Sequence, residues 1–137
     1  MKYTYTLREL PEIAGKILSS TAHKTILFYG EMGAGKTTLI KELAKSIGIT
    51  DTLSSPTFSL VNEYQTNDTT LYHFDFYRIE SEDEALDMGV EEYLDSGHWN
   101  FIEWPQKIQN LLPDLYTNIE LKVNSNGSRT INILPMS

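Results

Sequence analysis

The stretch that decides the fold is Gly30-Glu31-Met32-Gly33-Ala34-Gly35-Lys36-Thr37, with Thr38 directly behind it. It fits the pattern G-x-x-x-x-G-K-[S/T], in which a glycine-rich loop surrounds phosphate groups. The three glycines let the backbone come close to an anion and turn several N–H groups toward it. Lys36 supplies a positive charge for the outer phosphates, and the Thr37 hydroxyl is a ligand for the accompanying Mg²⁺. The stretch predicts a nucleotide site built from residues 30–38.

The residues on either side of this loop support the prediction. Residues 25–29 form a β-branched and aromatic run, which is typical of a buried parallel strand. Apolar residues at 39, 40, 43, 44 and 47 recur at helical spacing, and Gly48 suits the position after a helix end. Strand, loop and helix therefore follow in the order that aims a helix N-terminus at the phosphates.

The rest of the 137-residue chain predicts an α/β fold of one domain, residues 1–137. We expect a P-loop NTPase-like arrangement, with a mixed parallel and antiparallel sheet and helices on both faces. The further expected strands are 2–7, 57–64, 70–76, 98–103, 116–123 and 129–134, with hairpin turns at 65–68 and 124–128. The further expected helices are 10–19, one opened by a capping box at 81–84, a short one at 91–95, and one after Pro105.

Composition limits the kinds of binding partner and the cellular compartment that we expect for this chain. The net charge is −8, and Lys and Arg together number 11. Proteins that grip nucleic acid unaided have a basic surface, so we expect no tight direct binding of tRNA or other nucleic acid. The chain has no cysteine, no apolar run of membrane-spanning length, and an N-terminus without the apolar core of a signal peptide. A cytoplasmic protein without membrane association is the expectation.

A phosphate loop needs an acidic residue at the end of another strand to hold hydrated Mg²⁺. Asp75 and Glu103 each end an apolar run, and ligands collect at the carboxyl ends of strands in open α/β sheets. For each, the alternative is a surface carboxylate that caps a strand end. Thr57, in the segment Ser54–Phe58, is a candidate switch residue for a γ-phosphate; an ordinary turn fixed by Pro56 is the alternative.

Three other features have weaker functional interpretations. His73 alternates with apolar neighbours, which indicates a core or strand-face histidine rather than a ligand. Trp104 follows Glu103 and suits core packing and a site role equally well. Residues 80–95 contain eight acidic side chains and no Lys or Arg, which is typical of a solvated face; a docking patch for a basic partner is the alternative.

The chain resembles the TsaE (YjeE) family of small bacterial P-loop ATPases. The resemblance rests on the loop at 30–37, on Ser55-Pro56-Thr57-Phe58, on His73-Phe74-Asp75-Phe76-Tyr77-Arg78, on Gly89-Val90-Glu91-Glu92-Tyr93-Leu94 and on Glu103-Trp104-Pro105. These motifs stand in the family's order across roughly residues 30–105, and the flanks match only in general pattern. The resemblance implies an ATP/ADP-binding, Mg²⁺-dependent accessory ATPase for threonylcarbamoyladenosine modification of the tRNA adenosine next to the anticodon.

The same resemblance implies roles for single residues. Thr37 and Glu103 would hold Mg²⁺, Thr57 would act as the switch, and Asp75 would be the Walker-B-type carboxylate beside the catalytic Lys36. It also implies two partners, proteins of the TsaB and TsaD types. Where members often carry a threonine near adenine, this chain has Leu10 or Pro11, so no adenine contacts are assigned.

Two other classes of protein contain the same phosphate-loop motif. A small-metabolite or nucleoside kinase would clamp the transferred group with several arginines, but this chain has only Arg8, Arg78 and Arg129. A GTPase-like switch would carry an N-K-x-D guanine reader, which the sequence lacks. An ATPase is therefore favoured. Because no arginine finger is evident beyond Arg78, we expect slow turnover by the chain alone and stimulation by its partners.

Overall fold

The computed structural model describes residues 2–21, 23–31, 35–54, 56 and 60–136. Within these ranges the strands are β1 (Lys2–Tyr5), β2 (Thr25–Tyr29), β3 (Val61–Gln65), β4 (Thr70–Asp75), β5 (Trp99–Glu103), β6 (Tyr116–Val123) and β7 (Arg129–Met136). The α-helices are α1 (Leu10–Ser20), α2 (Lys36–Ser46), α3 (Glu82–Asp87) and α4 (Val90–Leu94), and two 3₁₀ helices cover Leu7–Glu9 and Pro105–Leu111. Helices are interleaved with strands along the chain, as in an α/β fold, and β3–β4 and β6–β7 are consecutive strands.

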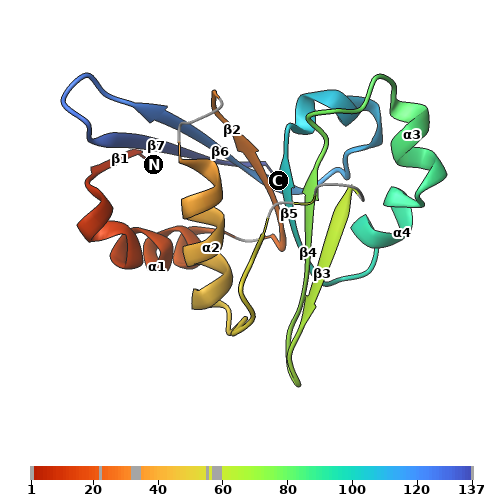
Figure 1. Ribbon diagram of the computed structural model, residues 1–137, viewed down its shortest axis with the longest axis horizontal. Coiled ribbons are helices and arrows are strands. Elements are labelled where there is room, and N and C mark those ends of the chain that lie inside the picture. The colour runs from red at the N-terminus through yellow and green to blue at the C-terminus, as the bar shows by residue number, and fades with distance from the viewer. Residues whose placement is uncertain (1, 22, 32–34, 55, 57–59, 137) are drawn as a thin grey trace.

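The described strands form one mixed sheet in the order β1-β7-β6-β2-β5-β4-β3 (Figure 1). β2 lies at the centre and runs parallel to both β5 and β6. β4 is parallel to β5, while β3, β7 and β1 join through antiparallel pairs. The carboxyl ends of β2, β4, β5 and β6 therefore meet at one edge of the sheet, where the phosphate loop begins. The predicted mixed α/β sheet is confirmed.

Helices cover both faces of this sheet, as the sequence predicts (Figure 1). The alternation of side chains in β2 explains how: Ile26 and Phe28 point into one apolar cluster, and Leu27 points into another. The first cluster packs α1 and α2 against the sheet, and the second packs α3, α4 and the Pro105–Leu111 helix against β4 and β5. Because both faces of β2 are buried, the strand preceding the loop is held from both sides.

Most predicted element boundaries are confirmed to within a residue or two. The capping box at 81–84 opens α3, with Glu84 Oε2 accepting the backbone N–H of Ser81 at 3.3 Å. β3 and β4 pair across the predicted hairpin, as do β6 and β7. Gly48 follows α2 with φ of +101°, a left-handed conformation that favours glycine. In the described part of the chain, no helix is both long and apolar enough to cross a membrane.

Three predicted elements differ from the structure. The first strand ends at Tyr5 instead of residue 7, because Thr6 turns the chain and its backbone N–H donates to Glu9 Oε1 at 3.0 Å. The strand predicted at 57–64 is β3, which begins at Val61; residues 57–59 lie outside the described residues. The helix after Pro105 is a 3₁₀ helix interrupted at Ile108, which leaves helical geometry where its side chain is buried in the second cluster.

Candidate nucleotide site

The candidate site lies at the N-terminus of α2, which follows directly from β2 and the phosphate loop. Gly35 is the residue before the helix and has φ of +95°, which explains the need for glycine there. Lys36 is the first helical residue and its side chain is buried; Thr37 is half-buried and Thr38 is exposed. Four of the predicted site residues, Met32, Gly33, Ala34 and Thr57, lie outside the described residues.

Two carboxylates come together at the ends of neighbouring strands. Asp75 is the last residue of β4 and Glu103 is the last of β5, and the two are direct partners in the parallel register. Glu103 also stands opposite Phe28 of β2, one residue before Tyr29 and the loop. The sequence argument that both carboxylates sit at the carboxyl edge of the sheet beside the loop is therefore confirmed for their position.

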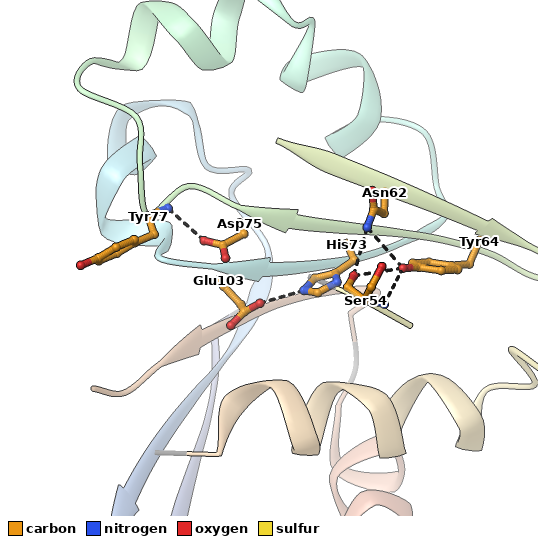
Figure 2. Close-up of polar contacts among 7 residues, drawn as sticks. All are labelled: Ser54, Asn62, Tyr64, His73, Asp75, Tyr77 and Glu103. Atoms are coloured by element: carbon orange, nitrogen blue, oxygen red, sulfur yellow. Dashed lines mark hydrogen bonds and ion pairs between the residues drawn. The ribbon is translucent and has the colours of Figure 1, made fainter. Parts of the chain in front are cut away.

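Glu103 is 4% exposed and its side chain contacts a buried histidine. His73 Nε2 and Glu103 Oε2 are 2.9 Å apart, and Figure 2 shows the two side chains pointing toward one another. His73 precedes Asp75 by two residues in β4, so the two side chains share one face of the strand. The contact fixes one oxygen of Glu103 and leaves the other available to a ligand.

Asp75 is half-buried and is held by the backbone beyond its strand. The Tyr77 N–H donates to Asp75 Oδ1 at 2.9 Å (Figure 2). Burial raises the pKa of Asp75 and nearby Glu103 raises it further, while the Tyr77 N–H, His73 and Lys36 act in the opposite direction. Asp75 thus ends its strand as a half-buried carboxylate that lies near Glu103, His73 and Lys36.

Lys36 extends from the helix start toward this carboxylate pair. Its Nζ atom lies 4.1 Å from the centre of the Trp104 ring, which makes a cation–π contact. Burial lowers the pKa of Lys36, while Glu103 and Asp75 act to raise it. The site therefore combines a partly desolvated ammonium group with two carboxylates, which suits an anion and a cation bound side by side.

Trp104 takes a backbone conformation that is unusual for its type. Its φ of +57° lies in the left-handed region, and the next residue is Pro105, which begins the 3₁₀ helix. This turn brings the indole ring against Tyr77, with ring centres 4.9 Å apart, as well as beneath Lys36. Trp104 also packs against the second apolar cluster, so the structure shows core packing as well as contact with Lys36.

The chain leading to the predicted switch segment is fixed to the sheet at its first residue. The Ser54 carbonyl accepts hydrogen bonds from Asn62 Nδ2 at 3.0 Å and from the Tyr64 hydroxyl at 3.2 Å (Figure 2). Both donors are in β3, which pairs with β4, the strand that ends at Asp75. Ser54 is thereby anchored on the half of the sheet that carries the carboxylates.

Comparison with known proteins identifies the family. The family described as threonylcarbamoyl adenosine biosynthesis protein TsaE matches residues 4–131 of this chain. The chain belongs to the TsaE family. The predicted resemblance is confirmed, and it extends beyond the motif region at 30–105 to nearly the whole chain.

Individual TsaE relatives agree with this assignment. A tRNA threonylcarbamoyladenosine biosynthesis protein TsaE from Nostoc sp. is 39% identical over 121 residues, or 85% of this chain and 74% of that protein. The protein of the same name from Haemophilus influenzae is 37% identical, over 83% of this chain and 75% of that protein. The crystal structure of Bacillus subtilis YdiB is similar to this structure, with a TM-score of 0.81 and 27% sequence identity. The superposition covers 100% of this chain and 86% of the YdiB chain.

The oxygen donors of this TsaE chain fit a hard divalent cation. Mg²⁺ binds carboxylate, hydroxyl and phosphate oxygens, and it keeps several waters. The side chains of Glu103, Asp75 and Thr37 supply such oxygens. The negative charge of Glu103 raises the pKa of Asp75, and a bound cation would offset this effect. Among the described residues no group of three or more His, Cys, Asp or Glu side chains is placed to hold a metal ion.

Two residues in or beside the site were not predicted from the sequence. His73 is buried in β4, as the interpretation of a core or strand-face histidine predicts, but its contact with Glu103 was not predicted; its spacing of two from Asp75 was the available signal. Arg129, from β7, packs against Gly35, and its distance of 94 residues along the chain from that glycine gave no signal. Both contacts depend on strand pairing, which local sequence patterns do not specify.

Proposed function

We propose that this chain is an accessory ATPase of tRNA threonylcarbamoyladenosine biosynthesis, acting as one cytoplasmic domain that spans residues 1–137. The biosynthetic role follows from membership of the TsaE family. ATP/ADP as the nucleotide and Mg²⁺ as the metal are our extension of that membership to this site. The alternative of a small-metabolite kinase has no such support.

The observation that carries the proposal is the convergence of Lys36, Asp75 and Glu103 beside the start of α2. Lys36 is 6% exposed and lies within electrostatic influence of both carboxylates. A buried lysine at a helix N-terminus favours a phosphate group, and paired carboxylates at adjoining strand ends favour a divalent cation. A nucleoside triphosphate with its metal brings both charges at once.

In this mechanism the protein acts by positioning and charge neutralisation. The loop N–H groups and Lys36 would bind the β- and γ-phosphates, and burial strengthens these contacts because water does not screen them. Mg²⁺, when bound by Thr37 and Glu103, supplies further charge neutralisation for the phosphate oxygens. Asp75, with Oδ1 fixed by the Tyr77 N–H, would use its remaining oxygen to hold and orient water.

Three residues would support this chemistry from the surroundings. His73 would hold the orientation of Glu103 through the 2.9 Å contact. Trp104 would shield the Lys36 ammonium group from water on one side. We propose that Thr57 is the switch residue that senses the γ-phosphate, because its segment begins at the anchored Ser54.

The partners would be proteins of the TsaB and TsaD types, and tRNA would be reached through them. A net charge of −8 leaves too few cations for tight RNA binding by counterion release. Seven of the eight acidic residues at 80–95 are exposed, on and around α3 and α4. We propose this acidic surface as the docking face for the partner complex.

Phosphate release from ATP tests the enzymatic part of the proposal. The purified chain should release phosphate slowly with Mg²⁺, should stop when EDTA is added, and should turn over faster with the partner complex. Lys36→Ala is the negative control for contaminating ATPases. A rate that EDTA and Lys36→Ala leave unchanged would contradict the proposal, and an affinity pull-down with and without ATP would test the partners independently.

A further inference from the structure

Arg129 reaches the candidate site from a distant part of the chain. It is the first residue of β7 and pairs with Val123 at the end of β6 and with Tyr5 at the end of β1. β6 runs parallel to β2, so the turn between β6 and β7 lies at the same edge of the sheet as the phosphate loop. The β6–β7 hairpin thus places Arg129 at the carboxyl edge of the sheet.

The Arg129 side chain lies on the face of the sheet that α2 covers. Ile131 and Ile133 follow it at intervals of two, and both are buried in the cluster that contains α1 and α2. A Cβ atom placed on Gly35 would come within 2.7 Å of Arg129 Nε and 3.4 Å of its Cζ. Only a glycine at position 35 lets the guanidinium pack this closely on the start of α2.

This contact places the Arg129 guanidinium beside two other sources of positive charge at the start of α2. The N-terminus of α2 carries the positive end of the helix dipole, and Lys36 follows Gly35 directly. An anion bound at this end of α2 would therefore meet the helix dipole, Lys36 and the Arg129 guanidinium together. The arrangement fits a ligand that carries several negative charges.

The position of Arg129 also indicates which part of a nucleotide it would meet. Asp75 and Glu103 come from β4 and β5 on one side of β2, and Arg129 comes from β7 on the other side. A metal bound at the carboxylates would repel a guanidinium. Arg129 is therefore suited to phosphate oxygens that lie away from the metal.

We propose that Arg129 is a phosphate-binding residue of the nucleotide site, on the side of the loop opposite the carboxylates. This inference rests on the proposed nucleotide-binding function. A guanidinium can give two parallel hydrogen bonds to one phosphate group, which makes it a stronger partner than a lysine. Because the contact avoids the metal side, it would serve ADP and ATP alike and contribute to binding rather than to the chemical step.

The test compares Arg129→Gln and Arg129→Lys with Lys122→Gln as a matched control. Lys122 lies next to Val123 in β6, so its side chain points to the opposite face, and its substitution removes the same charge from the same hairpin. Titration with ATP, ADP and adenosine would measure affinity, and phosphate release would separate KM from kcat. Melting without ligand would confirm that each variant is folded.

Arg129→Gln should weaken ATP and ADP equally, by about ten- to a hundredfold, because a hydrogen bond to a charged group is lost. Adenosine binding should be unaffected, the loss in turnover should appear in KM, and Arg129→Lys should restore part of the affinity. Unchanged ATP and ADP affinities, or a loss confined to kcat, would overturn the inference while leaving the proposed function in place. Failure of the unmodified chain to bind ATP or ADP would overturn both.

Discussion

The Lys36 ammonium group stands 4.1 Å above the centre of the Trp104 ring, although the two residues come from different elements of the site. Trp104 is held in a left-handed turn between Glu103 and Pro105. A ligand that draws Lys36 toward a phosphate would change the environment of the indole directly. We therefore expect Trp104 to report the bound state.

Trp104 fluorescence should therefore change when ATP or ADP binds with Mg²⁺. Trp99 lies at the other end of β5 with Lys24 5.9 Å from its ring centre, so the measurement belongs in a Trp99→Phe background. We expect a saturable change in emission intensity or wavelength. Adenosine, which lacks phosphates, is the control and should give no comparable change. Trp104 emission that stays unchanged at saturating ATP would mean that Trp104 does not lie at the nucleotide site.

Glu103→Gln should lower turnover by about tenfold or more and raise the Mg²⁺ concentration needed for half-maximal rate, because a ligand oxygen loses its charge. Glutamine keeps the volume of the side chain and an acceptor for His73, so the buried contact survives. Phosphate release measured across a Mg²⁺ titration gives both quantities. A titration curve that matches the unmodified chain would make Glu103 a structural residue and leave the metal role to Asp75.

Asp75→Asn should stabilise the chain in the absence of ligand at neutral pH. A raised pKa means that the folded state binds the proton of Asp75 more tightly than the unfolded state does, so the ionised carboxylate opposes folding. This cost is fully present above the raised pKa and vanishes as pH falls below the ordinary value of about 4. We expect a melting temperature about 2–5 °C higher at pH 7.

The gain from Asp75→Asn should shrink as the pH is lowered through the range between the raised and the ordinary pKa. Thermal melts at a series of pH values would show this convergence with the unmodified chain. A variant that melts lower at pH 7 would mean that the hydrogen bond from Tyr77 to Asp75 Oδ1 outweighs the cost of burial.

Reversing charges on the acidic surface should impair stimulation by the partner complex while basal ATP turnover stays unchanged. The structure favours Asp87→Lys with Glu91→Lys for this test, because both residues are exposed. Glu82 and Glu84 are poor choices: Glu82 accepts hydrogen bonds from Asn110, and Glu84 caps α3.

Asp68→Lys with Asp114→Lys makes the same change in net charge at exposed positions elsewhere on the chain. We expect the pair on the acidic surface, and not this control pair, to lower the stimulated rate. If the partner complex stimulated ATP turnover by both variants to the same extent, the acidic surface would not be the docking face. Tight tRNA binding by the purified chain would contradict the wider claim that RNA is reached through protein partners.

The parts of this fold that the sequence predicted are those with strong local signals. The buried run at β2, the glycine at position 35 and the apolar spacing of α2 each specify their own structure within a few residues. The capping box of α3 and both hairpin turns are equally local. Asp75 and Glu103 could be paired in advance because each ends a strand, and strand ends meet at one edge of a parallel sheet.

The parts that it did not predict depend on contacts between distant elements or, for the first strand, on a competing local turn. The first strand ends early because Thr6 and Glu9 form a local turn that competes with the apolar–polar alternation. The segment after Pro105 loses helical geometry where Ile108 is buried. The approach of Arg129 to Gly35 depends on the pairing of β7 with β6, and the contact of His73 with Glu103 depends on the pairing of β4 with β5.

Calorimetric titration of ATP with Mg²⁺ into the unmodified chain and into Lys36→Ala tests the central claim most directly. We propose that Lys36 binds the phosphates, and its burial costs folding free energy, so the variant should remain folded by circular dichroism. We predict saturable binding to the unmodified chain and a loss of at least about tenfold in affinity for Lys36→Ala. Equal affinity of the two folded proteins for ATP would contradict the assignment of this site to nucleotide phosphates.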